Sequence, residues 1–348
     1  MIENIIQTQK INIMKKSVFF LIIFISLISC KEIKDDEPTY PPLTLPVSFD
    51  KQILADYHIT SIAFDNLGNA WIGTFKQGLI KYNSNQTIVY NSENSIISDE
   101  TIWDIAIDSK NNVWIGCNGL IKYNGSEFVR FDSNNSPIPE DFVSSISIDS
   151  KDNIWFSSSR FRQGGLVKYD GTKWTVYTPD NSELPANLIQ DIAIDKNDNV
   201  WLALSEVVTN SYLVKIFEDK WKIYTSDDLG FIPYYLGNIQ INSQNKLFAS
   251  IDYSLSSSML NNSPHIFTFD GTSTEKLLSD TYFYVRFITV DNQDNIWCSA
   301  FGGTYAIYDG KEWTICESAF EGSGISVIEQ AHDNKIWIGT GNGIRISN

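Results

Sequence analysis

The residues with catalytic potential in this 348-residue sequence do not form a compact motif. The three histidines, His58, His265 and His332, lack the short spacing of a zinc site. No Gly-x-Ser-x-Gly nucleophile motif is present. Acidic residues are plentiful, with 42 Asp and Glu, and two of them could converge from distant segments as general acid and base. We therefore expect no metal and no cofactor, and a glycan lyase or glycosidase stays as the catalytic alternative.

A second group of side chains suits binding. Aromatic faces with scattered polar partners bind sugar rings or peptide segments. The variable segments of the sequence contain the following candidates: Trp103, Asp104, Arg160, Arg162, Tyr234, Tyr235, Tyr253, Tyr282, Tyr284 and Arg286. The alternative is that these tyrosines only pack beneath long loops.

The elements that position these side chains come from an internal repeat. An aromatic residue recurs at steps of 40 to 49 residues: Trp71, Trp114, Trp155, Trp201, Phe248, Trp297 and Trp337. Each unit begins with an alternating apolar stretch such as Ile59 to Asp65, and this period of two indicates a strand. Turn residues then separate three further strands. A period in the forties with four strands per unit predicts an all-β, seven-bladed β-propeller.

The units resemble the two-component regulator propeller repeat. The segments Trp71-Ile-Gly-Thr74 and Trp337-Ile-Gly-Thr340 match its pattern fully, whereas the fifth unit, with Phe248, departs most. The resemblance covers about residues 58 to 348 and implies a fold, not a substrate. In that family such propellers often form the sensory part of envelope histidine kinases. No kinase or DNA-binding segment follows the repeats, so we expect any signalling to run through a partner protein.

Most residues that recur in every unit have a structural explanation. The repeated Trp is expected to pack between blades, because it occupies the same strand position each time. The segment Asp149 to Asn153 lacks the glycine and distal glutamate of an EF-hand, so turn chemistry explains its Asp and Asn better. The segment Gly339 to Gly343 joins two strands and precedes no helix, which excludes a phosphate-binding loop.

The binding candidates are predicted to share one face of the propeller. The turns between first and second strands are short and repetitive. The opposite face carries the blade-to-blade connections and three long loops, Ser157 to Gly164, Ser205 to Ser211 and Asp252 to Pro264. Variable loops on a rigid scaffold are where binding residues usually lie.

The two ends of the chain are expected to close the ring. The seventh unit stops after its third strand, and Val47-Ser-Phe-Asp50 is similar to the fourth-strand segment Phe128 to Asp132. The N-terminal segment is therefore predicted to supply the missing outer strand and to remove an exposed edge.

The first residues read as an export signal. Lys15 and Lys16 precede an apolar run, Ser17 to Ser29, that has the length of a signal-peptide core. Its end, Leu27-Ile-Ser-Cys30, resembles the lipobox in which the cysteine is lipidated. We expect a signal peptide over residues 1–29 with Met14 as the true start, a lipidated Cys30 with a tether over 30–45, and the propeller over 46–348. Cys117, Cys298 and Cys316 remain, and we expect no essential disulfide among them.

Charge narrows the choice of partners. The net charge of −16 argues against a nucleic-acid partner, because phosphate contacts need clustered Lys and Arg. We expect a monomeric outer-membrane lipoprotein on the periplasmic or cell-surface side. It contacts the membrane only through its lipid and acts as a binding, sensory or interaction module for a glycan or an envelope protein. A purely structural assembly subunit is a further alternative, which predicts an apolar patch on a blade edge.

Overall fold

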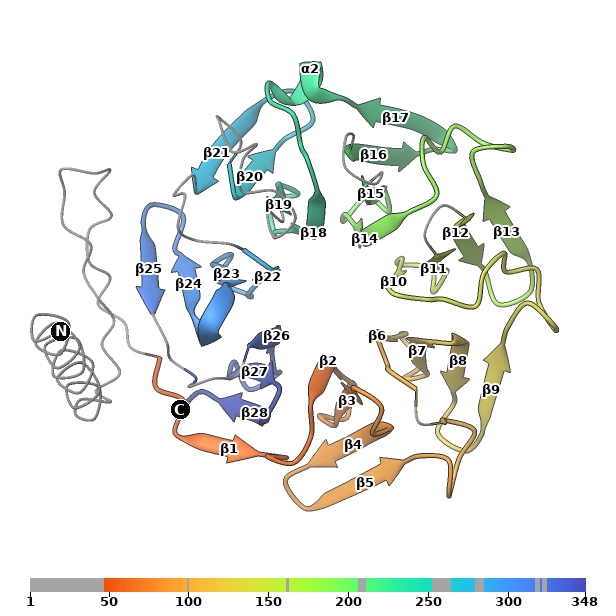
Figure 1. Ribbon diagram of the computed structural model, residues 1–348, viewed down its shortest axis with the longest axis vertical. Coiled ribbons are helices and arrows are strands. Elements are labelled where there is room, and N and C mark those ends of the chain that lie inside the picture. Colours follow the sequence, from red (N-terminus) through yellow and green to blue (C-terminus); the bar gives the residue numbers. More distant parts are fainter. Residues whose placement is uncertain are drawn as a thin grey trace, which may run out of the picture.

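Seven four-stranded antiparallel sheets form a ring around a central axis (Figure 1). The computed structural model describes residues 47–98, 100–160, 163–205, 211–251, 264–278, 285–316, 320 and 324–348. The prediction of an all-β, seven-bladed propeller is confirmed. In the described part of the chain the helical elements are short, α2 (Ser226–Leu229) and η1 (Phe301–Gly303), and no helix there is long and apolar enough to cross a bilayer.

Each blade runs from an innermost strand at the axis to an outer strand at the rim. Blades 1 and 2 contain β2 (Ile59–Phe64), β3 (Ala70–Thr74), β4 (Leu79–Asn83), β5 (Gln86–Tyr90), β6 (Asp104–Ile107), β7 (Val113–Cys117), β8 (Gly119–Tyr123) and β9 (Phe128–Phe131). Blades 3 and 4 contain β10 (Ile146–Ile148), β11 (Ile154–Arg160), β12 (Gln163–Tyr169), β13 (Trp174–Tyr177), β14 (Ile189–Ile194), β15 (Val200–Ser205), β16 (Ser211–Phe217) and β17 (Lys220–Tyr224). Blades 5 and 6 contain β18 (Leu236–Ile241), β19 (Leu247–Ile251), β20 (Ile266–Phe269), β21 (Thr274–Leu278), β22 (Phe287–Val290), β23 (Ile296–Ser299), β24 (Tyr305–Tyr308) and β25 (Trp313–Cys316).

Blade 7 joins the two ends of the chain, as the sequence predicts. It contains β26 (Ile325–Gln330), β27 (Ile336–Thr340), β28 (Gly343–Ile346) and, as its outer strand, β1 (Lys51–Ile53). The predicted location of the closing strand at Val47 to Asp50 is wrong by a few residues, because Lys51 pairs with Ile346 and Ile53 with Ile344. Val47 and Phe49 instead pack into the apolar cluster of blades 6 and 7, where the Phe49 ring lies 5.7 Å from that of Tyr305.

The ring has two unlike faces. We call the face formed by the turns between first and second strands, and between third and fourth strands, the turn face. The opposite face, formed by the loops between second and third strands and by the blade-to-blade connections, is the connection face. One expected loop there is shorter than predicted. The strands β11 and β12 remain paired as far as Arg160 and Gln163, so Ser157 to Arg160 belong to a strand.

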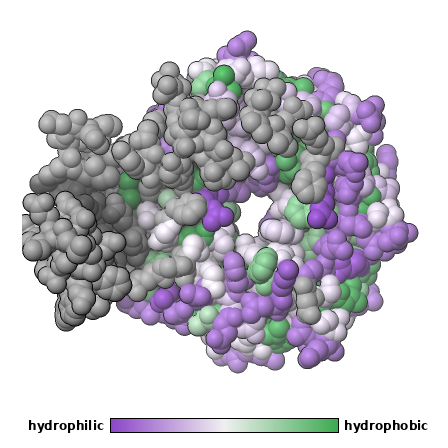
Figure 2. All heavy atoms as spheres, viewed as in Figure 1, coloured by the Kyte–Doolittle hydropathy of each residue, from purple (hydrophilic) through white to green (hydrophobic). Residues whose placement is uncertain are grey.

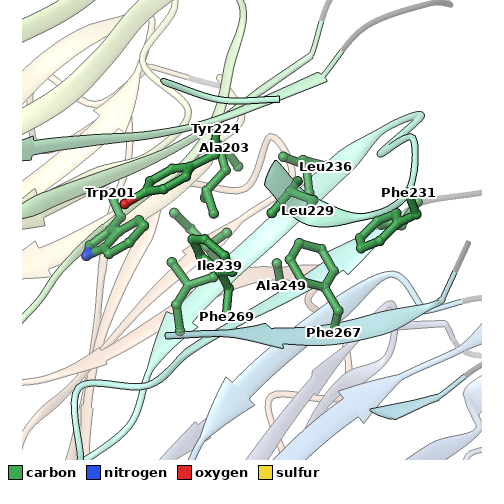
Figure 3. Close-up of a cluster of buried hydrophobic side chains, with 13 residues drawn as sticks. Trp201, Ala203, Tyr224, Leu229, Phe231, Leu236, Ile239, Ala249, Phe267 and Phe269 are labelled. Carbon is green, nitrogen blue, oxygen red and sulfur yellow. The ribbon is translucent and has the colours of Figure 1, made fainter. Parts of the chain in front are cut away.

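The recurring tryptophans pack between blades, as expected. Trp201 is 4% exposed and stacks on Tyr224 of its own blade at 5.8 Å, while Phe269 of the next blade meets it edge-on at 6.5 Å (Figure 3). Lys215 lies over the ring of Trp201 at 4.7 Å. Six of the seven repeat positions carry Trp, and the burial of these large aromatic surfaces supplies the adhesion between neighbouring blades.

A buried carboxylate fixes five of the six recurring tryptophans to the first turn of their blades. Asp65 accepts hydrogen bonds from the backbone N–H of Leu67 and Asn69, from Asn69 Nδ2 and from Trp71 Nε1, the last at 2.9 Å. Blades 2, 3, 4 and 6 repeat the Asp–Asn–Trp set at residues 108, 149, 195 and 291 and their partners. The repeated Asp and Asn are therefore turn-stabilising residues.

The same turns join neighbouring blades around the turn face. The backbone N–H and Oγ of Ser109 donate to the two carboxylate oxygens of Asp152 in the next blade, at 3.0 and 2.7 Å. Asp152 has the left-handed backbone, with φ of 61°, that Asp and Asn tolerate in turns. Equivalent bonds cross the other junctions, from Asn66 to Asn111, Ser150 to Asp198, Lys196 to Asn245, Ser243 to Asp294, Asn292 to Asn334, and His332 to the carbonyl of Asp65. Most polar groups described on the turn face therefore form hydrogen bonds within or between blades.

Blade 7 breaks this pattern at one position. Ala331 occupies the place of the recurring Asp, and Trp337 Nε1 is buried without an acceptor among the described residues. In blade 5, by contrast, Asn242 takes the Asp position and Phe248 the Trp position, so no indole N–H needs an acceptor there.

Replacement of Ala331 by Asp is expected to stabilise the propeller, because it supplies the acceptor that Trp337 lacks. A gained buried hydrogen bond contributes about 1 kcal/mol, which for a chain of this size raises Tm by about 2 °C. Calorimetry of A331D in the wild-type and Trp337→Phe backgrounds checks the cause. An equal gain in both backgrounds would contradict it, since the Phe background has no indole donor.

The three cysteines in the described residues, Cys117, Cys298 and Cys316, are free and buried, in agreement with the expectation of no disulfide. Strand β24 lies between the strands that carry Cys298 and Cys316. Burial raises the pKa of Cys117 to about 12, so its thiol is a poor nucleophile at neutral pH.

Candidate functional site

The connection face carries most of the exposed apolar side chains. Among the described residues six large apolar side chains are exposed, and four of them belong to this face: Phe75, Ile96, Trp103 and Ile232. Trp103, the largest, is 43% exposed and directly precedes β6, an innermost strand. An exposed Trp beside the axis is unusual enough to mark a candidate binding position.

Four rings form what we call the aromatic platform: His58, Phe75, Trp103 and Phe142. The rings of His58 and Phe75 lie 5.4 Å apart, as do those of Trp103 and Phe142. The two pairs are joined through the backbone, because Ile102 N–H donates to the carbonyl of Thr74 at 3.1 Å. The platform therefore extends across the connection face of blades 1 to 3.

Polar contacts hold the backbone beneath the platform. Glu100 forms an ion pair with Arg130 and accepts the N–H of Asn118 at 3.0 Å, while Arg130 also donates to the carbonyls of Asn118 and Ile96. On the other side, Val143 N–H donates to the carbonyl of Cys117 at 3.1 Å. These bonds tie both flanking connections to the turn between β7 and β8. The platform is thus preorganised, which reduces the entropy cost of binding.

An opening runs through the centre of the ring (Figure 2). The innermost strands β2, β6, β10, β14, β18, β22 and β26 surround it (Figure 1). Their charged side chains are Asp104, Asp191 and Glu329. All three are half-buried. The channel wall is therefore acidic.

Two of these acids cap backbone groups of the channel wall. Asp104 accepts the N–H of Ile105 at 2.8 Å and, across the blade junction, the N–H of Ile146 at 2.7 Å. Asp191 accepts the N–H of Ile239 in the next blade at 2.9 Å and the hydroxyl of Ser145 at 3.0 Å. An innermost strand has no neighbour on its axial side, so these carboxylates satisfy N–H groups that would otherwise lack a partner.

Burial raises the pKa of all three acids. The pKa of Asp104 rises to about 7, since desolvation outweighs the bond from Ile146 and the charge of Asp191 adds to it. Burial raises the pKa of Asp191, although four hydrogen bonds to its carboxylate act to lower it. The pKa of Glu329 rises to about 8 through burial and the charge of Asp104. The channel thus favours a proton or another positive charge.

The structure places the predicted binding residues at separate points of the connection face. Trp103 and Asp104 adjoin the channel. Arg160 is exposed at the end of β11, Tyr234 and Tyr235 are half-buried before β18, and Arg286 is exposed before β22. Arg162, Tyr253, Tyr282, Tyr284 and the predicted lipidation site Cys30 lie outside the described residues.

Several residues of the site were not predicted. His58, Phe75 and Phe142 lie in connections and loops, where strand alternation carries no information. Glu329 lies on an innermost strand, and its signal was present in the sequence. By register with the recurring aromatic residue it corresponds to Ala63, Ala106, Ser147, Ala193, Gln240 and Thr289, of which none is charged.

A sequence model of the two-component regulator propeller family matches residues 96–119, a stretch that includes Trp103, Asp104 and Trp114. No curated protein sequence matches this chain.

Solved structures share the fold. The extracellular domain of a protein described as a hybrid two-component system of B. thetaiotaomicron is 18% identical with a TM-score of 0.66; the match covers 84% of this chain and 39% of that one. Virginiamycin B lyase from Staphylococcus aureus is 13% identical with a TM-score of 0.66, covering 84% and 96%. PorZ of Porphyromonas gingivalis, a surface component of the type-IX secretion system, is 16% identical with a TM-score of 0.62, covering 87% and 48%.

The chain spans about two fifths of the length of that extracellular domain. At these identities the likeness shows the fold alone. The chain is thus a seven-bladed β-propeller in which one stretch, residues 96–119, matches the two-component regulator propeller family.

Proposed function

We propose that this chain is a lipid-anchored module of the cell envelope that binds a glycan or an envelope protein on its connection face. The aromatic platform is the observation that carries the proposal. It presents Phe75 and Trp103, each more than two fifths exposed, on backbone that is fixed by the Glu100–Arg130 pair. Rigid aromatic rings bind sugar rings and peptide segments with little loss of conformational entropy.

The proposed location rests on the N-terminal sequence. The apolar run and Leu27-Ile-Ser-Cys30 support export and lipidation of Cys30, with residues 31 to 45 as a tether to the outer membrane. Structural neighbours from sensor systems and from a secretion system with a surface component agree with a binding or sensory role in the envelope. Multiple acyl chains on the cysteine anchor a protein stably.

The glycosidase alternative receives less support from the channel. A retaining or inverting glycosidase needs one carboxylate free to act as nucleophile or base and one carboxyl group free to protonate the leaving group. Both oxygens of Asp104 and of Asp191 accept backbone N–H groups of the channel wall. These hydrogen bonds favour a structural role for the two carboxylates. Cleavage of a glycan by this protein would contradict that interpretation.

Replacement of Trp103 by Ala is expected to weaken ligand binding more than tenfold, because exposed Trp anchors dominate the affinity of binding surfaces. We would screen the full chain against a glycan panel by thermal shift, since a ligand of the folded state raises Tm, and against purified envelope proteins by direct titration. W103F should retain part of the affinity.

The matched control is Leu67→Ala, which removes an exposed apolar side chain from the turn face. The proposal is contradicted if W103A and L67A bind the same ligand equally well. Formation of product from a bound glycan would favour the enzyme instead.

A further inference from the structure

Glu329 differs from the other channel acids in having no structural partner. In the residues that the structure describes, its carboxylate forms no hydrogen bond and no ion pair. It lies on β26, the innermost strand of blade 7, and the charge of Asp104, two blades away around the ring, adds to burial in raising its pKa. A half-buried carboxylate without a partner is costly unless a proton or a ligand neutralises it.

At the level of Glu329 most blades contribute only small side chains to the wall of the central opening seen in Figure 2. In blades 1 to 4 these are Ala63, Ala106, Ser147 and Ala193. None of the seven innermost strands carries Lys, Arg or His. Arg286, which directly precedes β22, has interactions of its own, and its guanidinium lies near Gly324.

The acids continue inward from the aromatic platform. Trp103 stands at the connection-face end of β6, and Asp104 is the next residue along the strand. Glu329 is the fifth residue of β26, so it lies about 10 Å deeper than the level of Trp103, at 3.3 Å per residue. A long cationic side chain that passes Trp103 therefore meets first Asp104 and then Glu329.

We propose that the partner is a peptide segment with an exposed arginine or lysine, whose side chain enters the channel toward Asp104 and Glu329 while its backbone lies on the aromatic platform. The inference rests on the proposed binding function of the connection face and names its partner class. Two independent features point to it, the exposed aromatic rings and the acidic channel without a counter-charge. Trp103 attracts a cation through its π-face, and a guanidinium donates to carboxylates in the channel. The net charge of −16 attracts a basic segment over longer distances.

The proposal has a distinctive pH dependence. Burial holds the pKa of Glu329 at about 8, so at pH 6.5 its carboxyl is mostly protonated in the free protein. A cation prefers the ionised form, and arginine stays charged throughout, so affinity should increase from pH 6.5 to pH 9. The strands β2, β22, β23 and β27 pack on β26, and the only titratable side chain on these four strands is the buried Cys298. The other titratable groups on the innermost strands are Asp104 and Asp191.

The test uses the full chain and a library of short blocked peptides with a central arginine, each paired with its citrulline counterpart of equal shape and no charge. We expect selected arginine peptides to bind, citrulline to weaken binding about tenfold, and Glu329→Gln to produce the same loss and to reduce the pH dependence to the part that Asp104 contributes. The matched control is Glu127→Gln, which removes one negative charge from an exposed turn on the turn face. E127Q should leave affinity unchanged.

Each other outcome overturns the inference in a recognisable way. Binding that needs Trp103 but is insensitive to citrulline and to E329Q refutes the cation site and leaves the proposed binding function standing. Binding of glucosamine oligomers in place of peptides, dependent on Glu329, assigns the channel to a glycan. Failure of every arginine peptide to bind refutes the partner class, and circular dichroism of E329Q verifies that the variant is folded.

Discussion

Replacement of Asp65 by Ala is expected to lower the free energy of unfolding by about 4 kcal/mol. The carboxylate accepts hydrogen bonds from four buried or half-buried donors, including Asn69 Nδ2 and Trp71 Nε1. Each buried donor left without an acceptor costs about 1 to 3 kcal/mol, and the losses within one network are not additive. Urea unfolding followed by Trp fluorescence measures the change.

The chain itself provides the matched control for this prediction. Blade 5 carries Asn and Phe where blade 1 carries Asp65 and Trp71. An Asn side chain can still cap the turn N–H groups, but its own N–H₂ group cannot accept from an indole. Asp65→Asn should therefore be more costly with Trp71 present than in the Trp71→Phe background. If the double-mutant cycle shows no coupling, the indole bond does not contribute as argued.

The same network predicts how stability depends on pH. Burial alone would raise the pKa of Asp65, but the bonds from Asn69, Trp71 and the turn backbone hold that pKa below its ordinary value. A carboxyl with a depressed native pKa contributes stability that is complete above the unfolded pKa, about 3.9, and is lost as pH falls through the native pKa. The difference between wild type and D65A should thus shrink below about pH 4.

The repeated elements of this protein were predictable because each blade shows the same sequence pattern independently. The Trp spacing, the period-two strands and the Asp–Asn turns recur along the chain. A pattern that is weak in one unit can therefore be recognised from the others. Closure by the N-terminal segment also followed, since the last unit lacks an outer strand. The exact position of the closing strand could not be predicted, because the apolar residues Val47 and Phe49 resemble strand residues. In the structure they pack on Tyr305 and Phe320 instead.

The candidate site was less predictable because it is built from what does not repeat. Trp103 and Asp104 could be selected as deviations at the start of an innermost strand. Phe142 meets Trp103 of the preceding blade only through the ring geometry, whereas Phe75 meets His58 of its own blade just beyond the paired strands β2 and β3, where the strand pattern has ended. Glu329 could have been found by comparing equivalent strand positions, since a lone acid among small residues stands out once the blades are aligned.

Substitution of Gly343 by Ala is expected to have the second large effect, because it opens the junction between the chain ends. Gly343 has φ of +88°, and a Cβ there would lie 2.4 Å from the carbonyl oxygen of Ile53 and 2.5 Å from that of Leu54. These are backbone atoms of the closing strand β1 and the residue after it, so they can yield only by shifting β1 away from β28. The strain and the lost strand pairing together should cost about 3 kcal/mol or more.

Two glycine controls separate local strain from loss of closure. Gly341→Ala has no atom within 4 Å of the new methyl group and should change stability by no more than about 0.5 kcal/mol. Gly78→Ala creates a comparable clash, 2.3 Å from the Tyr90 carbonyl, but within blade 1, whose strands are consecutive in the chain. Strand β1 comes from the opposite end of the chain to the other strands of blade 7, so only the folded structure keeps it beside β28. G343A should therefore expose the amides along the full length of β1 and β28 to hydrogen exchange, whereas G78A should expose only β5 and its neighbour. Equal, purely local exchange in the two variants would show that the terminal strand does not close the ring cooperatively.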